Sequence, residues 1–400
     1  MKILVANLGS TSFKYRLYAL ADGREEMLAR GAVERIGSRE AKVTIRSPRG
    51  DIDLVEPIAD HGAALQICLD QLTDPHFGVI ERSDDIAAIG FKAVHARQLT
   101  GVHRVTEEVL DAMEAFADVA PAHNPPYTRA MRTLSDRFPR LPLVAAFETG
   151  FHRTIPEALQ RYAVPDDWAT QFGVRRWGFH GASHRYIAGR MAEMLGRQDL
   201  KLISCHLGGS SSLCAIKDGK SVACSLGMSP QSGLPHNNRV GDFDVFALPA
   251  ILHETGDTLE GILETLATKS GLEGLSGGAG CDLRDIEAAA EAGNTQAALA
   301  IDVFIASIRH YLGAYLLELG GADAIVFTGG IGENSPRIRA GVCRELGWFG
   351  IEMNWLKNAE AHGESLVSEP SSRVQVWTVP TNEEIVVARQ TRDLLTSSVA

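Results

Sequence analysis

The chain has 400 residues, of which 45% are hydrophobic and 22% charged, and its formal net charge is −11. This balance is typical of soluble globular proteins and excludes bulk disorder, and the length predicts two or three domains with large buried cores. The acidic balance argues against a nucleic-acid-binding protein and against binding to anionic membranes, so an anionic substrate must meet local cations.

The chain shows no targeting segment and no disulfide framework. We find no run of about 18 apolar residues and no signal-type start, so we expect no membrane span and a cytoplasmic location. The six cysteines are scattered without a C-x-x-C pair, which predicts reduced thiols and neither disulfides nor a zinc site.

Apolar runs and helical spacing alternate along the chain, which favours an α/β architecture. The expected elements are, in chain order, a strand at 2–7, a turn at 9–12, strands at 13–20 and 87–91, helices at 106–116 and 127–138, a strand at 143–147, a helix at 186–195, strands at 202–206 and 213–216, a helix at 296–319, a strand at 324–328 and a helix at 384–395.

One strand–turn–strand unit occurs twice. The segment 201–216 repeats the pattern of 2–20, and in both a Leu-Gly pair opens a Ser-rich turn. Gly/Ser hairpins are common, so duplication and coincidence both remain open on this pattern alone. A strand ends near Gly150, where we expect a domain boundary.

Two of these turns are candidate phosphate sites. In Asn7–Lys14, small residues let backbone N–H groups approach an anion, and Lys14 adds charge. The segment 206–212 (HLGGSSS) offers a second cradle of the same kind. The alternative for each is a solvated hairpin turn.

Three further patterns are weaker than they look. Gly219-Lys220-Ser221 is no phosphate-binding P-loop, because Cys214 stands where that motif needs glycine. The turn 329–334 (GGIGEN) lacks the third glycine of a dinucleotide fingerprint, although it follows a strand and a nucleotide could lie there. His180 and His184 have helical spacing but no third ligand, so we expect His180 in a cleft and His184 in a structural role.

Charged residues complete the pattern. Arg239 lies in a turn and suits bidentate contact with phosphate, or is an ordinary surface arginine. Asp282 suits a helix N-cap. The segment 381–384 (TNEE) offers oxygen ligands for Mg²⁺, or simply an acidic helix start. Phosphate turns, a cleft histidine, an arginine and carboxylates together suggest phosphoryl transfer.

In this order, these motifs resemble the acetate/propionate kinase family of the acetate and sugar kinase, Hsp70 and actin superfamily, over nearly the whole chain. The most specific segments are 7–14, 175–181, 233–244, 282–284, 328–335 and 381–384.

The resemblance implies two duplicated ribonuclease H-like (actin-like) α/β domains with an active-site cleft between them, in a homodimer. The expected division is 1–150 plus 385–400 as the acyl-kinase domain and 151–384 as the nucleotide-binding domain. The implied reaction transfers the ATP γ-phosphoryl group reversibly to acetate or a similar carboxylate, giving an acyl phosphate and ADP. The implied metal is Mg²⁺, with Mn²⁺ as an alternative.

The family's functional positions map onto this sequence. The implied metal site is Asn7 and Glu383, and the implied catalytic residues are Glu148, His180 and Arg239. The implied substrate pocket is Lys92, Val94, Ala122, Phe179 and Pro230. The implied nucleotide- and phosphate-binding residues are Ser10, Ser12, Lys14, His206, Leu207, Gly208, Gly209, Ser210, Asp282, Leu283, Arg284, Gly330, Ile331, Gly332, Glu333 and Asn334.

The sequence departs from the family pattern at several of these positions. The usual substrate-binding arginine is Lys92, which loses the bidentate fork. The usual catalytic aspartate is Glu148, a displacement of a carboxylate that can cost about 10²-fold in rate. Gly209 replaces an asparagine, Asn237-Asn238 replaces Gly-Thr, and Ala122 replaces a leucine, which predicts a larger acyl pocket.

Three explanations of these departures remain open: a different acyl substrate, a different phosphoryl donor or geometry, or reduced catalysis. The alternatives to a carboxylate kinase are therefore a nucleotide-binding regulatory paralogue and a kinase for another small acceptor. The retained Asn7, His180, Arg239 and Glu383 favour an active enzyme.

Overall fold

The computed structural model describes residues 1–21, 23–120 and 123–397. Two compact units form: unit 1 is Met1–Gly150 with Asn382–Ala400, and unit 2 is Phe151–Thr381. Unit 1 resumes at Asn382, three residues before the expected boundary at Ile385. Asn382 and Glu383 belong with unit 1 because their side chains contact Tyr18 and Lys92.

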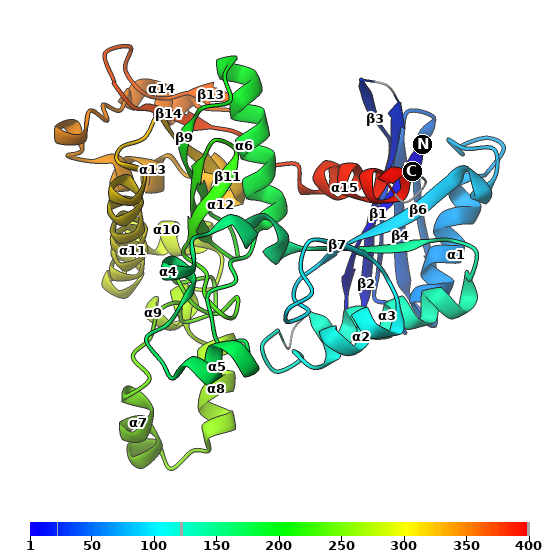
Figure 1. The fold of residues 1–400 in the computed structure, drawn as a ribbon, viewed down its shortest axis with the longest axis horizontal. Helices are drawn as coiled ribbons and strands as arrows, with labels where there is room; N and C mark the ends of the chain where they lie inside the picture. Colours follow the sequence, from blue (N-terminus) through cyan, green and yellow to red (C-terminus); the bar gives the residue numbers. More distant parts are fainter. Residues whose placement is uncertain (22, 121–122, 398–400) are drawn as a thin grey trace. The chain divides into compact units, whose positions relative to one another are not determined.

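Unit 1 is built on one mixed sheet (Figure 1). Its strands are β1 (Lys2–Gly9), β2 (Ser12–Ala21), β3 (Arg24–Glu34), β4 (Ala41–Ser47), β5 (Gly50–Glu56), β6 (Ile86–Ala93), β7 (Val102–Arg104) and β8 (Leu143–Phe147). Their order across the sheet is β5-β4-β3-β2-β1-β6-β8-β7. β1, β6 and β8 run parallel, whereas β1 to β5 form an antiparallel meander.

Helices cover both faces of this sheet. They are α1 (His61–Leu72), α2 (Glu107–Glu114), α3 (Asn124–Arg137) and α15 (Glu383–Ser397), with a 3-10 turn η1 (Ser83–Asp85). On one face, α1 and α3 pack on a core that includes Leu4, Phe13 and Leu17, all fully buried. On the other face, α15 packs against β1, β2 and β6 (Figure 1).

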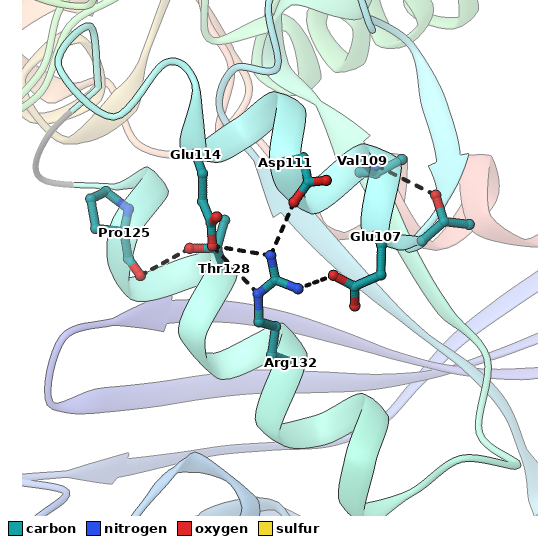
Figure 2. Close-up of polar contacts among 8 residues, drawn as sticks. Glu107, Val109, Asp111, Glu114, Pro125, Thr128 and Arg132 are labelled. Carbon is teal, nitrogen blue, oxygen red and sulfur yellow. Dashed lines mark hydrogen bonds and ion pairs between the residues drawn. The ribbon is translucent and has the colours of Figure 1, made fainter.

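An arginine joins α2 to α3. Figure 2 shows Arg132 of α3 among Glu107, Asp111 and Glu114 of α2, with ion-pair distances of 3.3 Å to Asp111 and to Glu114. Thr106 caps α2 by accepting from the Val109 N–H. These contacts tie down α3, the helix that carries Tyr127 toward the edge of the sheet.

Unit 2 contains a second mixed sheet. Its strands are β9 (Lys201–His206), β10 (Ser212–Lys217), β11 (Lys220–Cys224), β12 (Ala324–Thr328), β13 (Ser365–Leu366) and β14 (Gln375–Thr378), in the order β11-β10-β9-β12-β14-β13. Asp218 and Gly219, both at positive φ, form the β10–β11 turn.

The helices of unit 2 include one long core helix, α11 (Thr295–Leu319), which packs on β9, β10 and β11. The others are α4 (Glu157–Gln160), α5 (Asp166–Gln171), α6 (Gly181–Leu195), α7 (Ala247–Thr255), α8 (Leu259–Thr268), α9 (Gly271–Leu275), α10 (Leu283–Glu291), α12 (Gly329–Asn334), α13 (Pro336–Cys343) and α14 (Trp355–Glu360), with 3-10 turns η2 (Glu148–Thr154), which begins in unit 1, and η3 (Gly347–Phe349).

Helix α11 is long and apolar enough to cross a membrane by length and composition. A core helix meets the same two criteria, so α11 does not contradict the sequence-based expectation of no membrane span. Its buried side chains, among them Phe304, Ile308 and Leu312, belong to the main core of unit 2, which is the pattern of a core helix in a soluble protein.

The two sheets share one plan. In each, the first strand (β1 or β9) has an antiparallel meander on one side and two parallel strands on the other, so β3-β2-β1-β6-β8 corresponds to β11-β10-β9-β12-β14. The repeated strand–turn–strand pattern in the sequence is thus a real duplication.

Candidate active site

The carboxyl ends of β1, β6 and β8 gather polar residues at one edge of the unit 1 sheet. Asn7 lies near the end of β1, Lys92 near the end of β6, and Glu148 directly follows β8. Because these strands are parallel neighbours, their carboxyl ends meet at the same edge, where α/β folds commonly bind ligands.

Tyr127 of α3 holds Asn7. Its hydroxyl donates to Asn7 Oδ1 over 2.8 Å and accepts from the Leu8 N–H over 3.1 Å. Burial raises the pKa of Tyr127 to about 12, so its proton stays in place near neutral pH. The sequence reasoning missed Tyr127, because a tyrosine in an amphipathic helix carries no local signal of such a role.

Lys92 and Glu383 form a half-buried ion pair at this edge, with 2.6 Å between Nζ and Oε2. Burial alone would lower the pKa of Lys92, but the carboxylates of Glu383 and Glu148 raise it well above its usual range. Glu148 is itself only 5% exposed. The edge therefore holds one fixed ammonium between two carboxylates.

Helix α15 presents Glu383 and Glu384 from its first turn, where the helix dipole favours acidic side chains. Asn382 Oδ1 accepts from the Ile385 N–H and caps the helix. Glu384 lies 3.4 Å from Arg16 of β2. Two ion pairs therefore tie the start of α15 to the sheet.

The donor set at this edge fits Mg²⁺. The side chains of Asn7, Glu148 and Glu383 offer oxygen ligands, which a hard cation prefers. Within the described residues, no group of three or more His, Cys, Asp or Glu forms a metal cage. An ion held by one or two carboxylates and completed by substrate phosphates and water matches that arrangement.

The remaining predicted residues of unit 1 lie around the same edge. Ser10 and Ser12 flank the β1–β2 turn, with Ser10 exposed and Ser12 half-buried, and Lys14 follows on β2, with its side chain 60% exposed. Val94, directly after β6, is half-buried. Ala122, expected in the acyl pocket, lies outside the described residues.

In unit 2, His180 stands at the start of α6 with a left-handed backbone, φ 55°. Its Nδ1 is 2.8 Å from Ser212 Oγ, and its ring stacks on His206 with 4.3 Å between centroids. His206 Nδ1 in turn lies 2.8 Å from Ser183 Oγ. Serine hydroxyls thus fix both imidazoles.

His184 lies behind this pair and is fully buried. Its two ring nitrogens contact the hydroxyls of Ser204 and Ser212 at 2.9 Å. Burial lowers the pKa of His184 well below its usual value, so the ring is neutral. These contacts agree with the structural role expected for His184 and leave no nitrogen for zinc.

The glycine-rich turn after β9 is joined to the start of α12. The carbonyl of Leu207 accepts from the N–H groups of Ile331 and Gly332. Gly329 has φ 78°, and a Cβ there would lie 2.6 Å from that carbonyl. The segment 329–334, which we expected as a turn, is the short helix α12, and Glu333 Oε1 closes it by accepting from the Gly329 N–H.

Arg239 lies in a loop attached to the same turn. The Asn237 N–H donates to the Gly209 carbonyl, and the Arg239 Nη1 donates to the Pro230 carbonyl over 2.8 Å. Burial lowers the pKa of Arg239 to about 10, which leaves the guanidinium charged at neutral pH. The loop that carries Arg239 is thus hydrogen-bonded to the predicted phosphate turn through Asn237.

Other predicted residues of unit 2 are placed as follows. Asp282 caps α10 by accepting from the Arg284 N–H, and hydrogen bonds from Arg284 lower the pKa of Asp282 to about 2. Leu283 and Phe179 are buried. The Asn334 amide donates to the Gly330 carbonyl. Gly208 donates from its N–H to Ser211 Oγ, and Ser210 lies half-buried beside it.

Comparison with known proteins places this arrangement in a family. The family model described as "Acetokinase family" matches residues 2–389. The chain is 39% identical over 399 residues to an acetate kinase of Bacteroides fragilis, covering 99% of this chain and 100% of that one. It is 41% identical to an acetate kinase of Geobacillus kaustophilus, covering 97% and 98%.

Solved structures agree. Porphyromonas gingivalis acetate kinase superposes with a TM-score of 0.89 at 37% identity, covering 98% of this chain and 99% of that chain. A propionate kinase from Francisella tularensis superposes with a TM-score of 0.88 at 30% identity, covering 97% and 98%. These likenesses confirm the predicted two-domain, actin-like fold. The chain therefore belongs to the acetokinase family.

Proposed function

We propose that this protein is a carboxylate kinase that transfers the γ-phosphoryl group of ATP to acetate or a similar short-chain carboxylate, reversibly. A carboxylate oxygen forms a bond to the γ-phosphorus while the bond to the bridging oxygen of ADP breaks, which gives an acyl phosphate and ADP. The observation that carries the proposal is the gathering of Asn7, Lys92, Glu148 and Glu383 at one sheet edge, within a chain of this family.

The residues of unit 1 would bind the acceptor. A carboxylate is already ionised at neutral pH, so the reaction needs no strong base; the obstacle is the repulsion between two anions. The Lys92 ammonium attracts the acceptor, and Val94 offers apolar surface to its alkyl group. Glu383 and Glu148 hold Lys92 in place and keep it charged.

The residues of unit 2 would bind the nucleotide and the transferring group. The backbone N–H groups of Gly209 and Ser210 are suited to phosphate oxygens, whereas the N–H groups of Gly329, Ile331 and Gly332 already donate to Glu333 and Leu207. Arg239 and His180 stabilise the charge that develops on the phosphoryl group, and Asp282, Leu283 and Arg284 with α12 provide the adenosine pocket. Mg²⁺ bound at Asn7 and Glu383 would neutralise phosphate charge.

A panel of carboxylates tests the proposal. Acyl-hydroxamate formation from ATP, Mg²⁺ and acetate, propionate or butyrate should show turnover with at least one acid. Arg239→Ala should reduce kcat by orders of magnitude while leaving the circular dichroism spectrum unchanged. Nucleotide binding without product from any acid would favour the regulatory alternative. ADP release with alcohols but with no acid, measured by a coupled ADP assay, would favour another acceptor.

The same panel reports the size of the acyl pocket. Ala122, in place of the family's leucine, motivates a preference for acids longer than acetate. Each buried methylene contributes about 0.8 kcal/mol, so the preference should be modest. A higher kcat/KM for acetate than for propionate and butyrate would contradict this part of the proposal.

We further propose a cytoplasmic homodimer. Helix α7 buries none of its residues, and four apolar side chains on or next to α7 and α8 are strongly exposed: Val245 (63%), Phe246 (85%), Leu259 (44%) and Leu263 (49%). Such a patch in water favours association. Light scattering should give twice 43.2 kDa, and Phe246→Glu should give a monomer, whereas Trp348→Glu on η3 should not.

A further inference from the structure

A row of three arginines crosses the sheet of unit 1 on strands that α15 leaves partly uncovered. Register pairs Arg16 of β2 with Arg30 of β3, and Arg30 with Arg46 of β4. Directly paired residues project from the same face of a sheet, about 5 Å apart. We call Arg16, Arg30 and Arg46 the arginine row.

Like charges directly opposite each other destabilise a sheet, so such a row needs counter-charges. Arg16 pairs with Glu384 at 3.4 Å, and Arg46 pairs with Asp53 at 2.8 Å and Asp51 at 3.4 Å. Arg30, in the middle, has no ion-pair partner among the described residues. The row is therefore incompletely neutralised at its centre.

A cavity of about 310 Å³ lies over the row. Two residues along these strands, on the same face, the small residues Ala32 and Thr44 pair and leave space beside the guanidinium groups. Lys14 adds a fourth cation, which is 4.0 Å from Glu34. The lining holds four cations (Lys14, Arg16, Arg30, Arg46) and two carboxylates (Glu34, Glu384), a net charge of +2 in a chain of net charge −11.

We propose that the arginine row and its cavity bind a phosphate-type oxyanion. Guanidinium groups present planar pairs of N–H donors that match phosphate oxygens, and neighbouring arginines multiply those contacts. The cavity adjoins the candidate active site through Asn7 and Lys14 but extends away from it over β3 and β4. The proposal does not rest on the proposed kinase activity, because the three arginines of the row have no role in the proposed reaction, although the lining shares Asn7 and Lys14 with the candidate active site.

Calorimetric titration of the full chain with inorganic phosphate, in dilute chloride buffer, measures this site without turnover. We expect saturable binding that Arg30→Gln weakens at least tenfold. Arg24→Gln removes the same charge from the start of the same strand, outside the row, and should change the affinity less than twofold. Equal losses in both variants, or none in Arg30→Gln, would overturn the proposal.

Two further arms locate and identify the anion. Arg239→Ala should retain phosphate binding. Loss of phosphate binding in Arg239→Ala but not in Arg30→Gln would place the anion in unit 2 and refute the proposed site. Titrations with metal-free ADP and, separately, with succinate test two other anions as ligands. Binding of ADP that Arg30→Gln weakens supports a phosphate-type site, whereas succinate binding more tightly than phosphate refutes that ligand class.

Thermal unfolding provides an independent readout. Without phosphate, Arg30→Gln should melt no lower than the wild type, because it removes repulsion at the centre of the row. Phosphate should raise the Tm of the wild type and of Arg24→Gln, but not that of Arg30→Gln. A lower Tm for phosphate-free Arg30→Gln would show that the protein's own carboxylates satisfy the row, and would refute the proposal.

Discussion

Lys92 stands where the family resemblance implies an arginine, and its surroundings fix the position of its charge. Its ammonium lies 2.6 Å from Glu383 and interacts with Glu148, so it is fixed on one side by carboxylates. A lysine binds as a point charge, whereas an arginine would also offer a bidentate fork. The expected consequence is weaker binding of the acceptor rather than loss of catalysis.

Replacing Lys92 separates these effects. Lys92→Met should lower the free energy of unfolding at pH 7.5 by about 2 kcal/mol, less than for a fully buried pair, because it leaves Glu383 and Glu148 uncompensated. Protonation of these carboxyls would remove their uncompensated charge, so the deficit should shrink as pH falls toward 5. Urea unfolding at several pH values measures it.

The matched variant is Lys92→Arg. It keeps the cation, so its stability should stay near that of the wild type, and the regained fork should lower the KM for the carboxylate severalfold. A Lys92→Met protein with wild-type kcat/KM would remove Lys92 from the acceptor site.

Asn237 is a second residue at which this sequence departs from the family pattern. Gly209 lacks the amide that the family pattern has there, and a Cβ at Gly209 would lie 3.4 Å from Asn237 Nδ2. Asn237 Oδ1 is buried without a hydrogen-bond partner in the structure. The Asn237 amide therefore occupies the neighbourhood from which an amide has been lost.

We predict that Asn237 positions the phosphate turn. Asn237→Gly should raise the KM for ATP about tenfold, the scale of one charge-assisted hydrogen bond, and leave the KM for the carboxylate unchanged. The double variant Gly209→Asn with Asn237→Gly should recover most of the loss. Equal effects on both KM values would indicate a merely structural role.

At the scale of elements, α15 decides how closely Glu383 approaches Lys92. A Cβ at Gly90 of β6 would lie 2.4 Å from Thr391 Oγ1 and 3.0 Å from Val387 Cγ1, both on α15. The absence of a side chain at Gly90 thus sets the distance between helix and sheet.

Gly90→Ala should destabilise the protein by about 1–3 kcal/mol, the usual cost of overpacking, and lower kcat/KM by displacing Glu383. Thr391→Ala should be nearly neutral, because the hydroxyl it removes is buried without a hydrogen-bond partner in the structure. The double variant should be more stable than Gly90→Ala alone. Additive losses in this cycle would contradict the proposed contact.

The elements that sequence predicts well are those with strong local patterns. The apolar run of β1 and the periodic spacing of α3 and α11 are visible in the sequence, whereas the β3 sequence REEMLARGAVE mixes charges with apolar residues and carries no clear alternation. The segment 329–334 looked like a turn because glycines dominate it, but tertiary hydrogen bonds to Leu207 make it helical. Local propensity cannot report such contacts.

The residues of the candidate site also differ in how well the sequence predicts them. Asn7, His180 and Arg239 stand within recognisable motifs. The pairing of Lys92 with Glu383 spans 291 positions, and the arginine row depends on strand register. Tyr127 contacts Asn7, and Asn237 contacts Gly209, only through the fold. Such features follow from packing and cannot be inferred from spacing along the chain.

For the whole molecule, buried histidines predict acid sensitivity. Burial lowers the pKa of His152 to about 4 and those of His95 and His236 to about 3, and it holds the pKa of His184 well below its usual value. Below about pH 6.5 the unfolded chain binds protons at these positions, whereas the folded protein does not.

The free energy of unfolding should therefore fall as pH drops from 6.5 toward 4, by about 1.4 kcal/mol per pH unit for each such histidine, and change little through these groups above 6.5. Urea unfolding at pH 7.5, 6.5, 5.5 and 5.0 checks this, and His152→Asn should reduce the slope by one proton. A flat profile between pH 7 and 5 would contradict the prediction.

Unit 1 takes its last helix from the far end of the chain, after all of unit 2. During synthesis, β1, β6 and β8 are made early, but the apolar surface that α15 covers stays bare until the ribosome has added some 230 further residues. The acidic pair at Glu383 and Glu384 arrives with that helix. A chain that stops before Asn382 thus lacks the ion-pair partner of Lys92, and unit 1 can complete its fold only after all of unit 2 has been made.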